Sequence, residues 1–283
     1  MTRVPPADSL EGSLELDPDW TTKILSNFID TELHRTGLRD LVLGLSGGID
    51  SAVVAYVAAS AIEPARIHTY LLPFRTSSED SLRDARSVVD DLGLDTETLD
   101  ISPMVDGFEK TAGEVDRLRL GNVMARARMT VLYDRSAAHD ALVLGTSNKT
   151  ELLLGYGTLH GDMASALNPI GDLYKTQIRR LAEHLGVPES IRSKPPSADL
   201  WPHQNDEVDL GFSYDEVDRL LALLIDARAS RATAIEAGFP PKLIDDVTRR
   251  IVRTQFKRTL PVIAKISTRS IGWDFRYPRD WMT

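Results

Sequence analysis

The sequence contains no cysteine, and this absence excludes several kinds of chemistry. These 283 residues can form no disulfide bond, no thiolate metal site and no cysteine nucleophile. Histidine is the other common ligand of transition metals, but the six histidines show no paired ligand spacing: His34, His68, His139, His160, His184 and His203. We therefore interpret them as dispersed surface or core histidines.

Long apolar runs and a surplus of basic residues are also missing. No apolar run reaches the length of about 20 residues that a helix needs to cross a bilayer, so we expect no membrane association. The acidic N-terminus lacks the apolar core of an export signal, which predicts a flexible tail over residues 1–18 and a cytoplasmic location. The net charge of −9 argues against nucleic acid as a partner.

The first half of the chain contains apolar strands that alternate with helices. The first helix has clear start and stop signals in Asp17, Pro18 and Gly37, and Trp20, Ile24, Phe28 and Leu33 fall near one of its faces. Strands are expected at 41–46, 66–73, 96–101 and 141–146, and helices at 52–61, at 78–93 and in segments up to residue 137. This order predicts an α/β fold, a Rossmann-like parallel sheet with helices on both faces.

The second half has a different pattern. A helix that ends at Gly186 is followed by a long Pro-rich connector up to about residue 211, which is typical of a lid or binding loop. Helical stretches follow at about 213–227, 229–238 and 241–256, and the C-terminal tail is extended and basic-aromatic. We therefore expect a single domain over residues 19–283, with a C-terminal helical extension forming a cap over 210–256.

The loop S-G-G-I-D-S (46–51) lies directly after the first strand and before a helix. This position is the carboxyl edge of a parallel sheet and a helix N-terminus, where free backbone N–H groups stabilise phosphate oxygens. The two glycines allow close approach of the backbone, and the two serines can donate hydrogen bonds. The lysine of a kinase-type P-loop is absent, whereas Asp50 suggests a magnesium ion held against phosphates. Nucleotide binding is favoured over a simple capped turn.

The segment "LGLSGGIDSA" resembles the loop of N-type ATP pyrophosphatases, which cleave ATP between the α and β phosphates. Together with "VLGTSNKTELLLGY" (143–156), the block 168–218, "GNVMARARM" (121–129) and "FRYPR" (275–279), it resembles the ammonia-dependent NAD synthetases from about residue 20 to 280. The resemblance implies an adenine nucleotide alpha hydrolase-like fold. It also implies two half-reactions: deamido-NAD attacks the α-phosphate of ATP through its carboxylate and releases pyrophosphate, and ammonia then displaces AMP to form NAD.

The resemblance also implies roles for single residues. Asp50, Glu151 and Lys175 would be catalytic, and Asp50 and Glu151 would hold Mg²⁺. The implied ATP-binding residues are Gly44, Leu45, Ser46, Gly47, Gly48, Ile49, Asp50, Ser51, Thr146, Lys175 and Ser197. Arg126 and Lys257 would contact the acid substrate, while Arg128 could equally form a structural salt bridge.

The segment "TLHGDMASALNP" (158–169) departs from the pattern of this family, and so does the position before Lys257. Leu159 replaces the usual lysine, Met163 and Ala164 replace a glycine pair, and Ala166 replaces an acid. Phe256 replaces a histidine. Losing a cation and an anion from one pocket should weaken the recognition of a charged dinucleotide. The alternative hypotheses are therefore a paralogue that adenylates and amidates a different carboxylate, and a non-catalytic nucleotide-binding protein.

The absence of cysteine also bears on partners. Glutamine-hydrolysing relatives need a cysteine nucleophile, so the nitrogen source here would be free ammonia or ammonia from a separate glutaminase chain. The family forms homodimers with the dinucleotide site at the interface. We therefore expect a homodimer, with its contact on the helix over 115–137.

Overall fold

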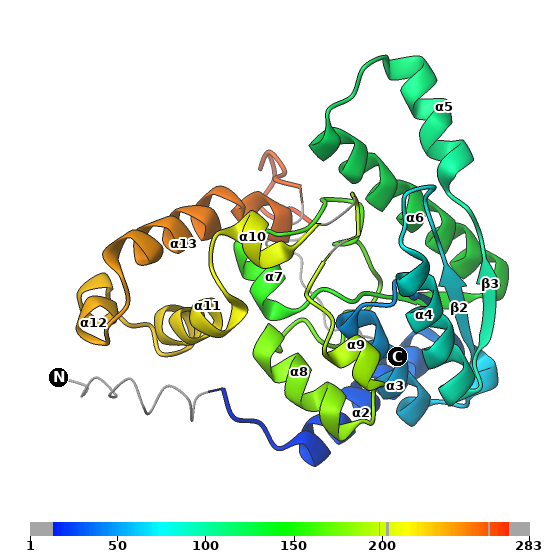
Figure 1. The fold of residues 1–283 in the computed structure, drawn as a ribbon, viewed down its shortest axis with the longest axis horizontal. Coiled ribbons are helices and arrows are strands. Elements are labelled where there is room, and N and C mark those ends of the chain that lie inside the picture. The colour runs from blue at the N-terminus through cyan, green and yellow to red at the C-terminus, as the bar shows by residue number, and fades with distance from the viewer. Residues whose placement is uncertain (1–13, 198, 202–203, 260, 272–283) are drawn as a thin grey trace.

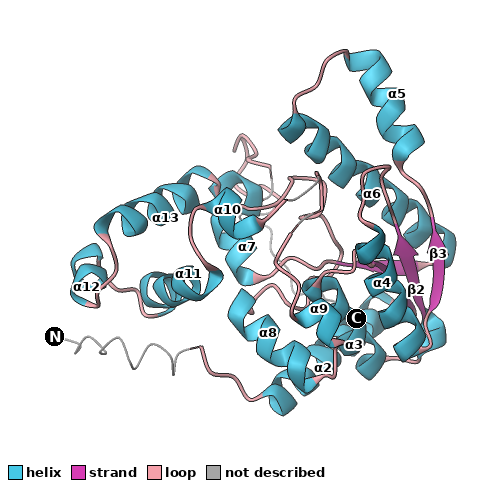
Figure 2. Cartoon of the chain, in the orientation of Figure 1, coloured by secondary structure: helices cyan, strands magenta, loops and turns pink. Residues whose placement is uncertain are grey.

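The computed structural model describes residues 14–197, 199–201, 204–259 and 261–271. Its centre is a sheet of four parallel strands in the order β3-β2-β1-β4. The strands are magenta in Figure 2, where β2 and β3 are labelled. The strands are β1 (Asp40–Gly44), β2 (Ile67–Leu71), β3 (Asp95–Thr98) and β4 (Ala141–Leu144). In the register of the sheet, Leu41 of β1 lies opposite Ile67 on one side and Leu142 on the other. A parallel bridge from Leu144 to Leu167 extends the sheet beyond β4.

Helices cover both faces of this sheet, as the sequence predicts (Figure 1). They are α2 (Pro18–Thr36), α3 (Ile49–Ala61), α4 (Glu79–Leu92), α5 (Ser102–Ala112), α6 (Arg117–His139) and α8 (Lys175–His184), while the short segment η1 (Pro64–Arg66) leads into β2. Side chains of successive strand residues point to opposite faces. Leu41 and Leu43 accordingly pack with α2, α3, α4 and α8, whereas Val42 and Val143 pack with α5 and α6.

The C-terminal helices form a cap with its own apolar core, separate from the sheet in Figure 1. The cap and the segments that lead to it are α7 (Lys149–Leu154), α9 (Glu189–Arg192), α10 (Asp206–Leu210), α11 (Tyr214–Leu221), the π-helical η2 (Ala222–Asp226), α12 (Arg231–Glu236), α13 (Pro241–Arg253) and η3 (Gln255–Arg258). Leu154 of α7 and Tyr174 are buried in this core, so the cap is joined to the loops at the sheet edge.

The chain is already packed against the cap at Leu14, before the expected boundary at residue 18. Leu14 is buried in the core of the cap, and Arg180 donates a hydrogen bond to its carbonyl oxygen at 3.4 Å. Asp17 caps α2 by accepting from the Trp20 N–H at 3.0 Å, as the sequence predicts. Residues 1–13 of the expected tail lie outside the described residues.

Two local predictions need adjustment. Trp20 and Ile24 of the expected apolar face are exposed, and α2 packs on the sheet through Leu33 of that face and through Ile29. The connector that follows α8 is not wholly irregular, because it contains α9 and α10. Among the described residues, no helix combines the length and the apolar character needed to cross a bilayer.

Candidate active site

The loop between β1 and α3 depends on a glycine at position 47. Gly47 has a φ of 78°, a conformation that L side chains rarely adopt. A Cβ atom there would lie 2.1 Å from the carbonyl oxygen of Ser81, which is backbone and therefore has little room to move. The loop thus packs directly against the first turn of α4.

This loop leads into an uncapped helix N-terminus. Gly48 is the N-cap residue of α3 and offers no side chain, while Ser46 and Ser51 bond to each other and to the loop backbone at 3.0–3.3 Å. The helix begins at Ile49, three residues earlier than expected, so Asp50 lies in its first turn. Backbone N–H groups at such a terminus stabilise anions.

Three charged side chains from different elements meet beside this terminus. The Lys175 ammonium, at the start of α8, forms an ion pair with Asp50, and its Nζ lies 3.7 Å from Glu151 Oε1. The side chain of Lys175 is only 4% exposed, and the two carboxylates are 17% and 18% exposed. The structure therefore brings together the three residues that the sequence indicates as catalytic.

Hydrogen bonds between distant parts of the chain support this cluster. Asn148 forms a capping box with Glu151 at the start of α7 and donates from Nδ2 to Asp50 Oδ1 at 2.9 Å. The buried carboxylate of Asp218 accepts from the Thr150 hydroxyl at 2.6 Å and from the Thr176 N–H at 2.8 Å. Asp218 thus ties α7 and α8 to the cap beneath the charged cluster.

The electrostatics of this cluster indicate a deficit of positive charge. Burial and the nearby Asp50 carboxylate raise the pKa of Glu151 to about 8, although Lys175 acts in the opposite direction. Burial lowers the pKa of Lys175, but Asp50 and Glu151 more than offset this effect and raise it overall. The positive charge of one lysine therefore has to compensate two enclosed carboxyl groups.

This donor set fits a magnesium ion. Magnesium prefers oxygen ligands, and it is usually bound by one or two carboxylates together with substrate phosphates and water. Asp50 and Glu151 supply that number, and no third His, Asp or Glu within the described ranges joins them in a metal-binding group. A divalent cation here would also relieve the repulsion between the two carboxylates.

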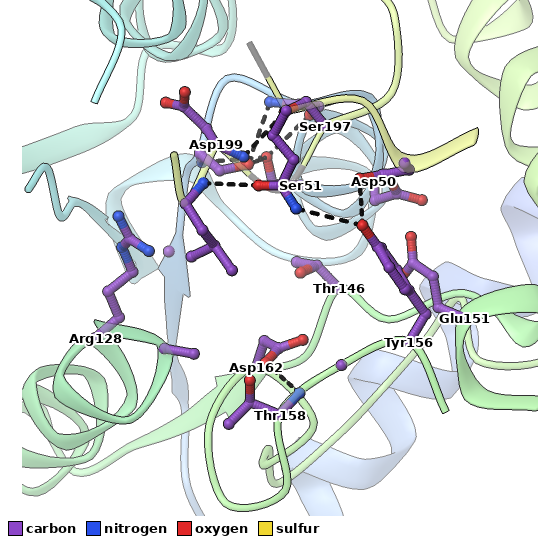
Figure 3. A pocket seen from close by; sticks show the side chains of 18 of the residues that line it. Asp50, Ser51, Arg128, Thr146, Glu151, Tyr156, Thr158, Asp162, Ser197 and Asp199 are labelled. Atoms are coloured by element: carbon purple, nitrogen blue, oxygen red, sulfur yellow. Dashed lines mark hydrogen bonds between the residues drawn. The ribbon is translucent and has the colours of Figure 1, made fainter. Parts of the chain in front are cut away.

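A cavity of about 800 Å³ opens beside the cluster. Of the residues expected to bind ATP, all but Gly47 and Ile49 line it: Gly44, Leu45, Ser46, Gly48, Asp50, Ser51, Thr146, Lys175 and Ser197. In Figure 3, Asp50, Glu151 and Tyr156 lie across the cavity from Arg128. Gly47 is not part of the cavity wall, and it permits the close contact between the loop and the backbone of Ser81.

The same cavity extends to the cap, where Lys257 lies in its wall together with Arg250 and Thr254. The Lys257 ammonium donates to the carbonyl oxygens of Gly155 and Gly157 at 2.8 and 2.6 Å. Burial lowers the pKa of Lys257, and the positive charges of Arg250 and Arg126 add to this shift. One cavity thus joins the expected ATP residues to one of the two expected substrate residues.

The second expected substrate residue and the family departures lie elsewhere. Arg126 is exposed, outside the cavity wall, and donates from Nε to the carbonyl oxygen of Leu159 at 3.1 Å. Leu159, Ala166 and Phe256 are also absent from the wall, and Phe256 is 58% exposed. The replacements at these positions therefore leave the cavity wall of a single chain unchanged.

Several cavity residues were not anticipated. Asp162 is part of the cavity wall, and its burial among protein groups raises its pKa. Tyr156 donates to Asp206 at 2.9 Å, and both lie within segments that carry the family resemblance. Arg128 lines the cavity and donates to the Leu72 carbonyl oxygen at 2.9 Å, in place of the structural salt bridge considered for it.

The parallel sheet, the uncapped terminus of α3 and the carboxylate–lysine cluster are the features expected of an α/β protein of the ATP pyrophosphatase class. The NAD synthase family model matches residues 21–261. The chain belongs to this family.

Individual relatives agree with this assignment. An NH(3)-dependent NAD(+) synthetase from Chlorobium phaeobacteroides is 55% identical over 95% of this chain and 97% of its own length. The solved NH3-dependent NAD synthetase from Campylobacter jejuni superposes with a TM-score of 0.76, at 36% identity over 88% of this chain and 100% of that one. An NMN synthetase from Francisella tularensis superposes with a TM-score of 0.78, at 31% identity over 88% and 99%.

Proposed function

We propose that this chain is an ammonia-dependent NAD synthetase, which adenylates the carboxylate of deamido-NAD with ATP and then amidates it. The observation that supports this most is the single cavity that joins the Asp50–Lys175–Glu151 cluster to Lys257. Two substrates that react with each other need adjacent sites in one enclosed space.

In the first half-reaction, the N-terminus of α3 and Lys175 would bind the phosphates of ATP. The backbone N–H groups and the ammonium are held in place before the substrate arrives, so they can stabilise the charge that develops as pyrophosphate leaves. A Mg²⁺ ion bound by Asp50 and Glu151 would supply further charge neutralisation on the phosphates. Thr146 and Ser197 line the same part of the cavity and can donate hydroxyl hydrogen bonds to ATP.

In the second half-reaction, ammonia attacks the acyl-adenylate and AMP leaves. Ammonium must lose a proton before it can attack, so an acceptor is needed near the reacting carbon. The carboxyl groups of Asp162, Asp206 and Asp209 line the cavity and can attract ammonium. We assign the acceptor role to this group of acids.

A different carboxylate substrate has no support in the cavity. Leu159, Ala166 and Phe256 motivate that alternative, but they lie outside the cavity wall. The relatives at more than half identity are NH(3)-dependent NAD(+) synthetases. Deamido-NAD is therefore the acid substrate that we propose.

The proposed assembly is a homodimer located in the cytoplasm. The helix expected to form the contact is α6, where Leu118 is 68% exposed and Tyr133 is 43% exposed; Met104 and Phe108 on α5 add further exposed apolar surface. Exposed apolar surface of this kind is typical of interfaces. Ammonia would come from solution or from a separate glutaminase chain.

The proposed function is tested by supplying ATP, Mg²⁺, ammonium and deamido-NAD and following the products by mass spectrometry. We expect one NAD, one AMP and one pyrophosphate for each ATP consumed, and no AMP without deamido-NAD. If AMP forms only with a different carboxylic acid, the assignment of deamido-NAD is wrong.

A further inference from the structure

Arg250 is a cavity residue to which the family resemblance gives no role. It lies near the end of α13 and lines the cavity close to Thr254 and Lys257. Its Nη1 atom is buried and has no hydrogen-bond partner among the described residues. A buried guanidinium nitrogen without a partner is costly, so an anion at this position would be strongly favoured.

The surroundings of Arg250 carry a surplus of positive charge. Lys257 already donates two of its three N–H groups to the carbonyl oxygens of Gly155 and Gly157, so only one remains for a ligand. The charges of Arg250 and Arg126 disfavour the protonated form of Lys257, and Asp162 is the acid that acts against them.

Other cations of the cavity already have protein partners. Lys175 is paired with Asp50 and Glu151, and Arg128 donates to the carbonyl oxygen of Leu72. The Nη1 atom of Arg250, in contrast, is buried without a hydrogen-bond partner among the described residues, and Arg250 is part of the cavity wall. An oxyanion bound at this end of the cavity would give Arg250 a partner that the described residues do not supply.

We propose that Arg250, together with Lys257, binds an oxyanion of the acid substrate and thereby contributes to its selection. This inference rests on the proposed function. A guanidinium presents planar, paired donors that match carboxylate and phosphate oxygens. Deamido-NAD carries both kinds of oxyanion, a nicotinate carboxylate and a pyrophosphate, and the experiment separates them.

The test compares R250Q with the wild-type chain and with R253Q. Arg253 lies on the same helix, is exposed and is not part of the cavity wall, so R253Q makes the same charge change outside the site. Binding of deamido-NAD and of NAD is measured by calorimetry in the presence of Mg²⁺ and saturating α,β-methylene-ATP, which fills the ATP site without reacting. The KM for ATP and the melting temperature are measured alongside.

We expect R250Q to weaken deamido-NAD binding roughly 10- to 100-fold, the loss typical of one hydrogen-bonded charge. The KM for ATP should change less than about 2-fold, and R253Q should match the wild type. NAD differs from deamido-NAD only in having an amide in place of the carboxylate. An equal loss for NAD would place Arg250 on the pyrophosphate, whereas unchanged NAD binding would place it on the carboxylate.

Unchanged binding of both dinucleotides by R250Q would overturn the proposal, and so would a parallel loss of ATP and dinucleotide binding with a lower melting temperature. If R250Q does not fold, R250K keeps the charge but not the paired donors. It should bind deamido-NAD at least about 3-fold more weakly, and equal binding would refute the role. The two proposals fail separately: a wild-type chain that makes no NAD refutes the function, whereas unchanged binding by R250Q refutes only the role of Arg250. A wild-type chain that binds neither dinucleotide overturns both.

Discussion

The two ends of the cavity are built in different ways. At the ATP end, Asp50, Glu151 and Lys175 are already paired with one another and held by hydrogen bonds from Asn148. At the other end, Lys257 donates to backbone carbonyl oxygens, and Arg250 has a buried nitrogen without a hydrogen-bond partner among the described residues. The charged side chains of the ATP end are therefore paired with one another and call for a further cation, whereas the acid end carries a cation that calls for an anionic ligand.

Removal of magnesium should have the largest effect, because it tests whether the ATP end needs a further cation. The ATP end holds two carboxylates for one lysine, so phosphate binding there requires a further cation. We expect a chelator such as EDTA to abolish AMP formation and added Mg²⁺ to restore it. Full activity in the presence of EDTA would mean that Lys175 alone supplies the charge.

Replacement of Lys175 should have the next largest effect. K175M leaves Asp50 and Glu151 enclosed without their cation and removes a donor to the phosphates. We expect kcat/KM to fall by a factor on the order of 10³. The control is K242M, because the Lys242 side chain is 91% exposed and pairs with Asp246 of the same helix, outside the cavity wall. A loss below about 10-fold would show that the cluster is structural.

A pair of glycine variants tests the shape of the ATP loop. Gly47 and Gly37 have nearly the same φ, 78° and 74°, but only a Cβ at Gly47 would meet another atom within 4 Å. We expect G47A to lower the free energy of unfolding by roughly 2–5 kcal/mol and to lose ATP binding. G37A should cost about 1 kcal/mol and bind ATP normally. Urea denaturation and ATP titration measure both, and equal losses would contradict the close contact with Ser81.

The smallest effect is expected at the positions that depart from the family pattern. L159K, A166D and F256H restore the usual residues outside the cavity wall. The KM for deamido-NAD should therefore change by less than about 2-fold. A tenfold decrease would show that these positions face the substrate, as they would in a site shared between two copies of the chain.

The ATP end was the part best predicted from the sequence. Its loop follows the first strand directly, and parallel strands end at one sheet edge, so Asp50, Thr146 and Glu151 had to lie close together. The four strands, the helices on both faces and the caps of α2 were also confirmed. The start of α3 was missed, because S-G-G-I-D-S has the composition of a loop although its last three residues are helical.

The acid end was harder to predict for a physical reason. Arg250 lies on an amphipathic helix and has no local signal of a buried position, since only the packing of the cap against Gly155 brings it to the cavity. The exposure of Trp20 has a similar origin: the apolar face of α2 was visible in the sequence, but which side meets the sheet depends on tertiary packing.

We propose that the acid substrate attacks the α-phosphate of ATP within this cavity. It is tested most directly with deamido-NAD labelled with ¹⁸O in both carboxylate oxygens. Attack through the carboxylate followed by displacement with ammonia must leave one labelled oxygen in AMP and one in the amide of NAD. Mass spectrometry of the products should therefore find one ¹⁸O in each AMP, and NAD formation accompanied by unlabelled AMP would contradict the account.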